Sequence, residues 1–585
     1  MAARRVLHRV GTPQRVGRGL AAGLFAAMAP IPGLRVVLGL LIATLVRGSR
    51  TIALGTQFIN LLIGIVPLVA AEFWIGRLFY KGAIATQSDA ITLVHTIESQ
   101  WRWTAPFASF AEAWRNCEQA GPAVLGPLLI GVLVLGGLAA LIAYPIGVIG
   151  AVKFYVYRLQ WNVRRGLSLH APRGMLTVPA PTTVDEQMSE DEALKRYALR
   201  PQTFVRADRI TLLLDGSQAY PEMLRAISEA KTSVTLETYI LQADDTGKRF
   251  SRELARAAQR GVNVRLLYDA VGALGLPYSY VQELLAVGVR VSVYRPLNTA
   301  WRRSLFTFHR RDHRKILVVD DRISFTGGIN ICHDNAPKLE GGMAWRDMHV
   351  RIEGPAVAVK LKALTEETWK VADAFQETHE AKKPADASEP PEQFPAPLPD
   401  TSANVLVQVM GNKEFLQRMR LRRAYLHAIR HARRYILIEN AYFIPDRGIR
   451  RALYKAVKRG VTVSAGVAMY SDVKIVAMAS RALYSELLSN GVRLFEYPRS
   501  MLHSKVAVID DIWSIVSSYN LDHRSLRHNL EAGVVIVNRP FAVAIRDHIL
   551  NDIRESREVT PEYHDARPWD EVLIETLAYQ GRYWL

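Results

Sequence analysis

The sequence predicts an α-helical membrane domain followed by an α/β part, in which two pseudo-symmetric repeats each form a mixed sheet flanked by helices. The N-terminal third contains long apolar runs without charged residues, whereas the rest alternates strand-like and helix-like segments. Within that rest, short landmarks recur in the same order in two halves. The chain of 585 residues has room for several domains of this kind.

The net charge of +19 is unevenly distributed along the chain. Residues 1–178 carry 17 Lys and Arg against 5 Asp and Glu, whereas residues 179–585 carry 57 against 50. An enzyme that binds nucleic acid more often has its basic excess on the catalytic part. Basic residues beside apolar runs are instead typical of membrane proteins. The two cysteines, Cys117 and Cys332, cannot form a disulfide framework and indicate no oxidising compartment.

A membrane domain is predicted over residues 1–178. Two stretches without Lys, Arg, Asp or Glu are 21 and 34 residues long, and about 20 apolar residues are enough to cross a bilayer. A third apolar run is interrupted by proline, glycine and arginine, which favours a re-entrant hairpin over a straight span. The predicted segments are the hairpin at about 19–46 and the spans at about 51–74 and 120–145.

Clusters of basic residues precede the hairpin, follow it, and follow the last span. Such clusters belong on the cytoplasmic side, and two spans plus a hairpin place all three there. The sequence therefore predicts a multi-pass protein of the bacterial inner membrane with a cytoplasmic catalytic part. One alternative is a cleaved signal peptide at 1–29, which the continuing apolar sequence opposes. Buried helices of a soluble domain are the other alternative, and the 34-residue gap in charge opposes it.

The N-terminal domain resembles a small bacterial membrane family of unknown function. The resemblance rests on Gly-Leu-Phe-Ala-Ala-Met-Ala-Pro-Ile-Pro-Gly at 23–33, on Gly55-Thr56 with Asn60, and on Tyr144-Pro145. It implies no activity.

The two repeats are predicted at 204–379 and 404–570, separated by linkers at 179–203 and 380–403. Each repeat has a strand with a glutamate near its end, an Arg-Gly-Val turn, a Gly-Val-Arg turn and a His-x-Lys strand. Strand–helix alternation of this kind predicts a sheet flanked by helices in each repeat. The matching landmarks are Glu237 with Glu439, Arg260-Gly-Val with Arg459-Gly-Val, Gly288-Val-Arg with Gly491-Val-Arg, and His313-Arg-Lys with His503-Ser-Lys.

The His-x-Lys strands carry residues suited to phosphoryl transfer. Residues two apart on a strand share a face, so the His and Lys of each repeat project together. Lysine, asparagine and small donors can stabilise the charge that a phosphodiester transition state spreads over its oxygens. One His can attack phosphorus while the other protonates the leaving alkoxide. The same tail follows in each half: Asp320, then Gly327-Gly328-x-Asn330, and Asp510, then Ser517-Ser518-x-Asn520.

This doubled pattern of His-x-Lys, Asp and a small-small-x-Asn turn resembles the phospholipase D superfamily. Thr326-Gly-Gly-Ile-Asn-Ile, Trp345-Arg-Asp-Met-His and Ser518-Tyr-Asn-Leu-Asp-His-Arg-Ser look like its bacterial cardiolipin synthase branch, and the resemblance covers about residues 204–560. It implies that His313 is the nucleophile and His503 the acid and base. The catalytic residues so implied are His313, Lys315, Asp320, His503, Lys505 and Asp510, and the substrate-binding residues are Gly328, Asn330, Ser518, Asn520, Glu237 and Glu439.

Two details accompany this assignment. Glu237 and Glu439 lie near the ends of matching strands, and we expect them to orient the imidazoles. Ser517 stands where the family usually has glycine, so we expect a small adjustment of the phosphate pocket there.

The resemblance implies a membrane phosphatidyltransferase that makes cardiolipin from phosphatidylglycerol through a phosphohistidine. Water as the acceptor would make it a phospholipase D that releases phosphatidic acid. A nucleic-acid phosphodiesterase is a second alternative, which the near-balanced charge of residues 179–585 opposes, and the two intact motifs oppose a non-enzymatic scaffold. The expected partners are phospholipids and a membrane, without nucleic acid.

No metal or cofactor is expected, because His and Lys can supply the positive charge. His427 and His431 have the i,i+4 spacing of metal ligands, but the arginines around them would repel a cation.

One segment of the first half has no counterpart in the second. About 13 extra residues lie between Tyr294 and His313 and include Trp301-Arg-Arg-Ser-Leu-Phe-Thr-Phe-His-Arg-Arg. Aromatic residues interleaved with arginine favour contact with an anionic membrane surface, and a folded lid is the alternative.

Overall fold

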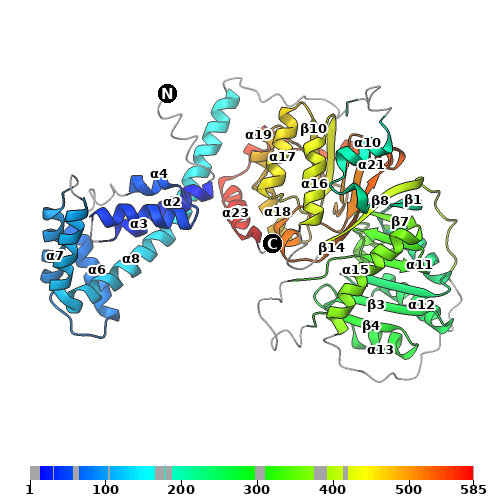
Figure 1. Cartoon of the computed structure of the whole chain (residues 1–585), viewed down its shortest axis with the longest axis horizontal. Coiled ribbons are helices and arrows are strands. Elements are labelled where there is room, and N and C mark those ends of the chain that lie inside the picture. The colour runs from blue at the N-terminus through cyan, green and yellow to red at the C-terminus, as the bar shows by residue number, and fades with distance from the viewer. Residues whose placement is uncertain are drawn as a thin grey trace. The chain divides into compact units, whose positions relative to one another are not determined.

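The structure is a computed structural model of the whole chain (Figure 1). It describes residues 13–29, 32–56, 65–102, 106–164, 178–179, 188–296, 310–373, 392–412 and 419–583. The chain folds into two compact units, Met1–Ser168 and Leu169–Leu585.

The first unit is helical. Helix α8 is broken at Gly121, whose φ of 68° lies in the left-handed region, and Pro122 follows directly. Helices α6 and α8 approach closely at Gly131, where a Cβ would lie 1.7 Å from the carbonyl oxygen of Glu72. The helices are α2 (Pro13–Ala27), α3 (Pro32–Leu45), α4 (Arg50–Gly55), α6 (Ile65–Phe79), α7 (Gln87–Gln100) and α8 (Pro106–Arg164).

Ala108–Gly150 of α8 is the one stretch among the described residues that is long and apolar enough to cross a membrane. The span predicted at 120–145 lies inside it. The hairpin predicted at 19–46 corresponds to α2 and α3, which pack on each other. The span predicted at 51–74 runs across residues 57–64, which lie outside the described residues.

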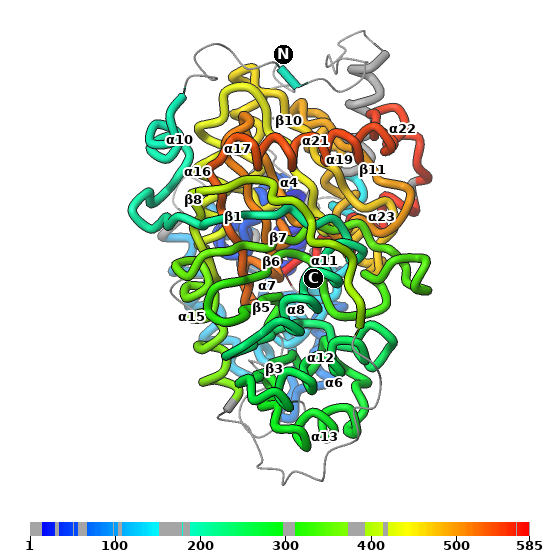
Figure 2. Tube along the Cα trace, turned by 90° about the vertical axis from the view of Figure 1, so that its right-hand side faces the viewer, coloured from blue at the N-terminus to red at the C-terminus, as the bar shows by residue number. Residues whose placement is uncertain are grey.

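The second unit is built on one fifteen-stranded sheet, in the order β15-β11-β10-β9-β12-β13-β14-β8-β1-β7-β6-β5-β2-β3-β4. Apart from β15, the order is the same from either end, because β1 to β7 of the first repeat correspond to β8 to β14 of the second. The repeats join where β1 (Val205–Leu214) pairs antiparallel with β8 (Ser402–Asn412), and Figure 2 shows these strands near the middle of the unit.

The remaining strands follow the predicted alternation with helices. In the first repeat they are β2 (Ser233–Thr238), β3 (Asn263–Asp269), β4 (Arg290–Tyr294), β5 (Ile316–Val319), β6 (Ile323–Gly327) and β7 (Met348–Glu353). In the second they are β9 (Tyr435–Asn440), β10 (Thr462–Ala468), β11 (Arg493–Tyr497), β12 (Lys505–Ile509), β13 (Trp513–Ser517) and β14 (Glu531–Val537), with β15 (Arg557–Glu558) at the edge.

Helices cover both faces of the sheet. The first repeat contributes α11 (Asp215–Ser228), α12 (Asp245–Gln259), α13 (Tyr278–Ala286) and α15 (Pro355–Asp373). The second contributes α16 (Arg420–His431), α17 (Arg447–Lys458), α18 (Lys474–Arg481), α19 (Tyr484–Ser489), α20 (His523–Arg527), α21 (Arg539–Glu555), α22 (Pro561–Asp565) and α23 (Trp569–Gln580), and α10 (Glu190–Tyr197) precedes the sheet.

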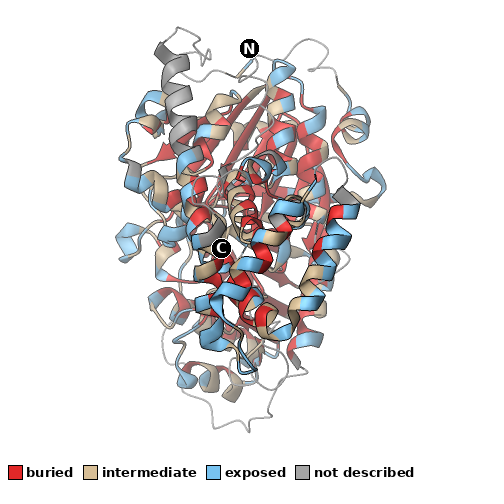
Figure 3. Cartoon of the chain, turned by 90° about the vertical axis from the view of Figure 1, so that its left-hand side faces the viewer, coloured by how far each residue is buried: buried red, intermediate tan, exposed pale blue. Residues whose placement is uncertain are grey.

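Coverage on both faces explains why strands such as β12 and β13 are buried along their whole length. Figure 3 shows buried strands behind helices whose outer sides are exposed. Each repeat has its own apolar core on one face. A third core, under α15 and α21, joins Val318 and Met348 of the first repeat to Leu437 and Val506 of the second. The two repeats are therefore halves of one folded body.

The repeated glycines end helices at equivalent places. Gly261 and Gly460 have φ of 86° and 88°, and Gly288 and Gly491 have φ of 90° and 81°. The left-handed conformation that often ends a helix favours glycine. The Arg-Gly-Val and Gly-Val-Arg landmarks thus have a common structural cause in both repeats.

Candidate active site

The two predicted histidines lie just before equivalent strands near the middle of the sheet. His313 precedes β5 and His503 precedes β12. Two parallel bridges, Asp312 with Leu530 and Arg346 with Leu502, hold each of these segments against the other repeat. Each histidine therefore lies beside the first residues of the strand β7 or β14 that belongs to the opposite repeat.

His503 is oriented by a carboxylate of the first repeat. Its Nδ1 lies 2.6 Å from Oδ2 of Asp347, and its backbone N–H donates to the carbonyl of Arg346 at 2.6 Å. Burial opposes ionisation of Asp347, but Lys505 and His503 outweigh it and hold the pKa of this carboxyl below its usual value. A charged Asp347 stabilises the protonated form of His503, but burial and the charge of Lys505 outweigh it and lower the pKa of His503 below its usual value.

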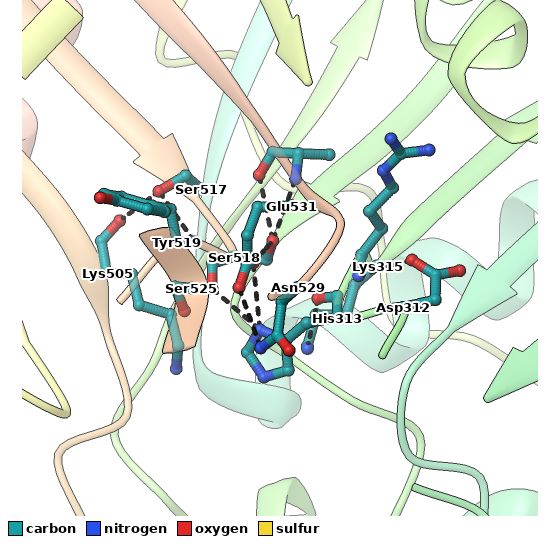
Figure 4. A network of polar contacts seen from close by, with 12 residues as sticks. Asp312, His313, Lys315, Lys505, Ser517, Ser518, Tyr519, Ser525, Asn529 and Glu531 are labelled. Atoms are coloured by element: carbon teal, nitrogen blue, oxygen red, sulfur yellow. Dashed lines mark hydrogen bonds and ion pairs between the residues drawn. The ribbon is translucent and has the colours of Figure 1, made fainter. Parts of the chain in front are cut away.

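His313 is oriented by a carboxylate of the second repeat (Figure 4). Its Nδ1 lies 3.1 Å from Oε2 of Glu531 and 3.1 Å from the carbonyl oxygen of Ser518. A carbonyl oxygen can only accept, so Nδ1 carries the proton and the lone pair is at Nε2. Burial raises the pKa of Glu531 to about 7, and burial followed by the charge of Lys315 lowers the pKa of His313 well below its usual value.

The two lysines are fixed beside the histidines in the same way. Nζ of Lys315 donates to the carbonyl of His313 at 2.8 Å, and Nζ of Lys505 donates to the carbonyl of His503. Both side chains are buried, and burial lowers their pKa values to about 7 and about 8. Two ammonium groups whose pKa values lie near neutral pH can bind the anionic oxygens of a phosphodiester.

Aromatic residues of the first repeat cover both imidazoles. The ring of Tyr239 lies 4.9 Å from that of His313, and the ring of Trp345 lies 5.2 Å from that of His503. Trp345 also lines a pocket of about 680 Å³, together with Ile240, Asp334, Met343, Tyr470 and Asp472. This space is large enough for a polar headgroup, and Trp345 is the lining residue that also contacts His503.

The small-small-x-Asn turns of both repeats also lie at the candidate active site. Oδ1 of Asn330 accepts from the backbone N–H of Ile240 at 3.3 Å, while its Nδ2 has no partner within the described part of the chain. Oδ1 of Asn520 is likewise buried without a partner there. These unpaired polar atoms agree with a role in binding substrate, which stays a prediction.

Gly328 and Ser518 contact the two orienting carboxylates. A Cβ at Gly328 would lie 2.1 Å from Oδ1 of Asp347, so any residue larger than glycine would displace this carboxylate. In the second repeat, Oγ of Ser518 donates to Oε2 of Glu531 and accepts from the backbone N–H of Ala532 at 3.1 Å. The two halves thus support equivalent carboxylates by different means.

Asp320 and Asp510 do not reach the histidines. They follow β5 and β12 at the far end of each strand, roughly 20 Å along the chain from His313 and His503. Asp320 accepts backbone hydrogen bonds from residues 231–233 at 2.7–3.2 Å. Asp510 accepts from residues 433–435 at 2.7–2.9 Å and from the hydroxyl of Tyr197 at 2.7 Å. The contacts of both aspartates fit turn residues that position the His-Lys strand, and a catalytic role for them stays a prediction.

Glu237 and Glu439 do not orient the imidazoles either. Both are fully buried, and burial raises their pKa values well above normal. Glu237 accepts from Oγ1 of Thr368 at 3.3 Å and lies 3.8 Å from Arg314, while Glu439 is close to Asp552 and Arg346. The expectation is wrong because a strand directs alternate side chains to opposite faces, and these glutamates point into the protein.

The substitution at Ser517 is compensated within the sheet. Ser517 pairs with Gly533, whereas in the first repeat Gly327 pairs with His349. A Cβ at Gly533 would lie 2.4 Å from that of Ser517, and one at Gly327 would lie 2.7 Å from Nδ1 of His349. One partner in each pair must therefore be glycine, and the two repeats place it on different strands.

Asp347 and Glu531 are the residues that the sequence did not single out as candidates. Asp347 directly precedes β7 and Glu531 begins the equivalent strand β14. A carboxylate at the start of the strand after each small-small-x-Asn turn was the available signal. The insertion with Trp301, predicted to touch a membrane, falls on residues 297–309 for the most part and lies outside the described residues.

Comparison with known proteins identifies both parts of the chain. A family model described as cardiolipin synthase, PLD-like domain, matches residues 223–369 and 425–553. A second, described as an uncharacterized protein conserved in bacteria (DUF2062), matches residues 2–160. Both resemblances inferred from the sequence are confirmed.

Curated relatives match this chain over most of their own length. Cardiolipin synthase B of Escherichia coli K12 is 37% identical over 375 residues, which is 64% of this chain and 87% of the relative. Cardiolipin synthase B of Salmonella typhi is 36% identical over 378 residues, with the same shares covered. Cardiolipin synthase A of Pseudomonas putida GB-1 is 33% identical over 425 residues, which is 72% of this chain and 84% of the relative.

Among solved structures, phosphatidylserine synthase of Haemophilus influenzae Rd KW20 aligns with a TM-score of 0.48 and 13% identity, over 65% of this chain and 94% of that one. The identity of the curated relatives and the share of their length that is matched decide the family. The chain belongs to the phospholipase D-like cardiolipin synthase family and is a phosphatidyltransferase of the phospholipase D type.

Proposed function

We propose that this protein makes cardiolipin by moving a phosphatidyl group between two phosphatidylglycerol molecules through a phosphohistidine. The observation that carries the proposal is the pair of buried histidines, each with Nδ1 on a carboxylate of the opposite repeat and each followed by a buried lysine. The curated relatives named cardiolipin synthase support the choice of product.

In the first step Nε2 of His313 attacks phosphorus, and the bond between phosphorus and the oxygen of the headgroup glycerol breaks. His503, protonated at Nε2, gives its proton to the departing glycerol alkoxide. The products are glycerol, neutral His503 and a phosphatidyl group bonded to His313. Lys315 and Lys505 balance the charge on the non-bridging oxygens throughout.

In the second step neutral His503 removes the proton from a hydroxyl of the second phosphatidylglycerol. That oxygen attacks phosphorus, and the bond between phosphorus and His313 breaks. Cardiolipin leaves, and both histidines return to their starting protonation states. Water in place of the second lipid would release phosphatidic acid from the same intermediate.

The unequal carboxylates favour His313 as the nucleophile. Burial and the charge of Lys505 lower the pKa of His503, but the ionised Asp347 opposes this, whereas the pKa of His313 is lowered well below its usual value. Burial raises the pKa of Glu531 to about 7, and the carbonyl of Ser518, which can only accept, keeps the proton on Nδ1 of His313 and the lone pair on Nε2. A nucleophile needs the free lone pair and a general acid needs the proton.

The first test is mass spectrometry of the lipids after the detergent-purified chain is incubated with phosphatidylglycerol. Cardiolipin with an equal amount of glycerol supports the proposal, and the variants His313→Ala and His503→Ala should form neither. Phosphatidic acid alone would identify a hydrolase and overturn the transfer step. No turnover of phosphatidylglycerol would overturn the proposed donor.

A second test assigns the two histidines. Phosphatidyl-p-nitrophenol has a leaving group that needs no proton, so His503→Ala should still release one equivalent of nitrophenolate in a burst and retain a lipid adduct on His313. His313→Ala should give no burst. The opposite pattern in the two variants would make His503 the nucleophile.

We also infer that the first unit holds the enzyme in the bacterial inner membrane with the second unit in the cytoplasm. The apolar stretch of α8 and the cluster of basic residues that follows it support this placement. The domain boundaries we propose are 1–178, 204–379 and 404–570. Labelling of single cysteines at Arg164 and at Thr86 from outside spheroplasts tests the topology, and labelling at Arg164 would overturn it.

A further inference from the structure

Exposed apolar side chains gather around the mouth of the active site. In the part of the second unit that the structure describes, the most exposed large apolar residues are Leu339, which is fully exposed, Leu274 at 74% and Tyr278 at 63%. A soluble surface seldom concentrates such side chains without a partner. Leu274 and Leu339 belong to loops that leave the sheet at the end where the histidines lie, and Tyr278 begins α13 directly after the first of these loops.

The first of these loops, 270–277, follows β3 on the His313 side of the site. A Cβ at Gly272 would lie 2.0 Å from the carbonyl oxygen of Tyr239, so the loop packs directly against this residue. The ring of Tyr239 covers His313 at 4.9 Å. Residues 270–278, Ala-Val-Gly-Ala-Leu-Gly-Leu-Pro-Tyr, contain no charged side chain.

The second loop, 469–473, follows β10, the strand equivalent to β3. Tyr470 and Asp472 line the 680 Å³ pocket together with Trp345, whose ring lies 5.2 Å from that of His503. Ile475, at the start of α18, is exposed just beyond this loop. The loops after two equivalent strands therefore flank the two histidines on opposite sides.

The third loop, 333–344, closes the ring between them. It contributes Lys338 and Met343 to the same pocket, and Leu339 stands next to Lys338 on its outer side. The apolar side chains of the three loops and of the first turns of α13 and α18 form what we term the apolar rim: Leu274, Tyr278, Leu339, Met343, Tyr470 and Ile475.

We propose that the apolar rim inserts into the surface of a phospholipid bilayer, so that a headgroup enters the site while its acyl chains stay in the membrane. The inference rests on the proposed function, because a site for a phospholipid must meet the lipid at the bilayer surface. Side chains of this size bury about 5–10 Å into the boundary between headgroups and acyl chains.

Apolar area is the main driving force for this contact. The three loops contain Asp334, Lys338, Glu340 and Asp472, so their net charge is −2 and does not favour anionic lipid. Attraction to anionic lipid is therefore weak, and insertion should depend little on salt.

The direct test measures depth in the membrane. Single cysteines that replace Leu274, Leu339 and Ile475 in the full-length chain are labelled with an environment-sensitive fluorophore. The substitution Cys117→Ser removes the more accessible native thiol, and Cys332 is buried. The protein is reconstituted in vesicles of phosphatidylcholine and phosphatidylglycerol that contain a lipid-attached quencher. Val359 on α15 is the matched control, because it is 56% exposed and follows the far end of β7.

The proposal predicts that quenching at the three rim positions is at least about threefold stronger than at Val359. It also predicts that 0.5 M salt leaves this quenching unchanged. Quenching no stronger than at Val359 overturns it. This readout does not depend on turnover, so it separates failure of the rim from failure of the proposed function.

An activity test adds the triple variant Leu274→Ser, Leu339→Ser and Ile475→Ser. We expect its turnover of phosphatidylglycerol in bilayers to fall about tenfold, while turnover of a dissolved short-chain phosphatidylglycerol stays unchanged. Equal rates of variant and wild type on both lipids would contradict the inference. If the wild type uses neither lipid, the proposed function fails, and the quenching result still decides the rim.

Discussion

Nδ1 of His503 in the second repeat lies 2.6 Å from Oδ2 of Asp347 in the first repeat. The reciprocal contact joins His313 of the first repeat to Glu531 of the second at 3.1 Å. Each repeat thus supplies one histidine and the carboxylate that orients the other. A single repeat would leave its histidine without an orienting group, which explains why the two halves share a sheet and a core.

Asp347→Asn should remove most of the activity without unfolding the protein. The amide can present its N–H₂ group to Nδ1, which favours the wrong imidazole tautomer, and it cannot stabilise the protonated His503. We expect kcat to fall on the order of 10³-fold with little change in KM. Steady-state kinetics on phosphatidylglycerol and a thermal melt check this expectation.

Glu353→Gln is the matched control, because Glu353 lies at the other end of β7 and pairs with Arg351. Its kcat should stay within about twofold of the wild type. An Asp347→Asn enzyme that also stays within twofold would rule out the orienting role.

The buried lysines predict a pH dependence of kcat/KM. Burial lowers the pKa values of Lys315 and Lys505 to about 7 and about 8. Their ammonium groups are lost as pH rises through these values, so kcat/KM should fall between about pH 7 and 9. Bound phosphate stabilises both ammonium groups, and the corresponding fall in kcat should appear at higher pH.

The measurement is a pair of pH profiles on the same lipid, with the melting temperature recorded at each pH. A kcat/KM that stays flat up to pH 9.5 would contradict a role of these lysines in binding the phosphate.

The sequence was sufficient to predict the sheet class and the position of both histidines and lysines, because the motif is repeated and a strand fixes which side chains share a face. It did not reveal Asp347 and Glu531. They lie 17 and 11 residues after Asn330 and Asn520, one is Asp and the other Glu, and each acts on the opposite repeat. Pairing across repeats follows from the joined sheet, which the spacing within one repeat does not encode.

The same limit explains the aspartates. Asp320 and Asp510 belong to the motif as reliably as the histidines, but a strand that begins at the site carries its last residue away from it. The role of Ser517 depends on Gly533 across the sheet, a pair whose members are 16 residues apart in the chain.

Asp320→Ala and Asp510→Ala should reduce stability more than catalysis. Asp510 is buried and accepts three backbone N–H groups and the hydroxyl of Tyr197, so its loss should cost about 3 kcal/mol of the free energy of unfolding. Asp320 is half-buried, and water can replace it at the exposed N–H groups of residues 231 and 232, so about 1 kcal/mol is expected. Chemical denaturation of both variants gives the two values.

Well below the melting temperature, both aspartate variants should retain kcat within about fivefold of the wild type. Tyr197→Phe is the control that removes only the hydroxyl bond to Asp510. A hundredfold loss of kcat in a variant that melts normally would restore these aspartates to the reacting centre.

The unequal support of the two carboxylates predicts unequal effects of two alanine substitutions. Gly328→Ala places a Cβ 2.1 Å from Oδ1 of Asp347, so the carboxylate must move and lose its 2.6 Å contact with His503. Activity should then fall nearly as far as in Asp347→Asn. Ser518→Ala removes one hydroxyl that donates to Glu531, but the carbonyl of Ser518 still accepts from Nδ1 of His313, so the loss should stay near tenfold.

Removing the hydroxyl of Ser518 also withdraws a hydrogen bond that lowers the pKa of Glu531. The pH profile of Ser518→Ala should therefore shift upward, while that of Gly328→Ala keeps its midpoint. Kinetics of the two variants on the same lipid decide the matter: equal losses with unshifted profiles would mean that the carboxylates of the two repeats are interchangeable.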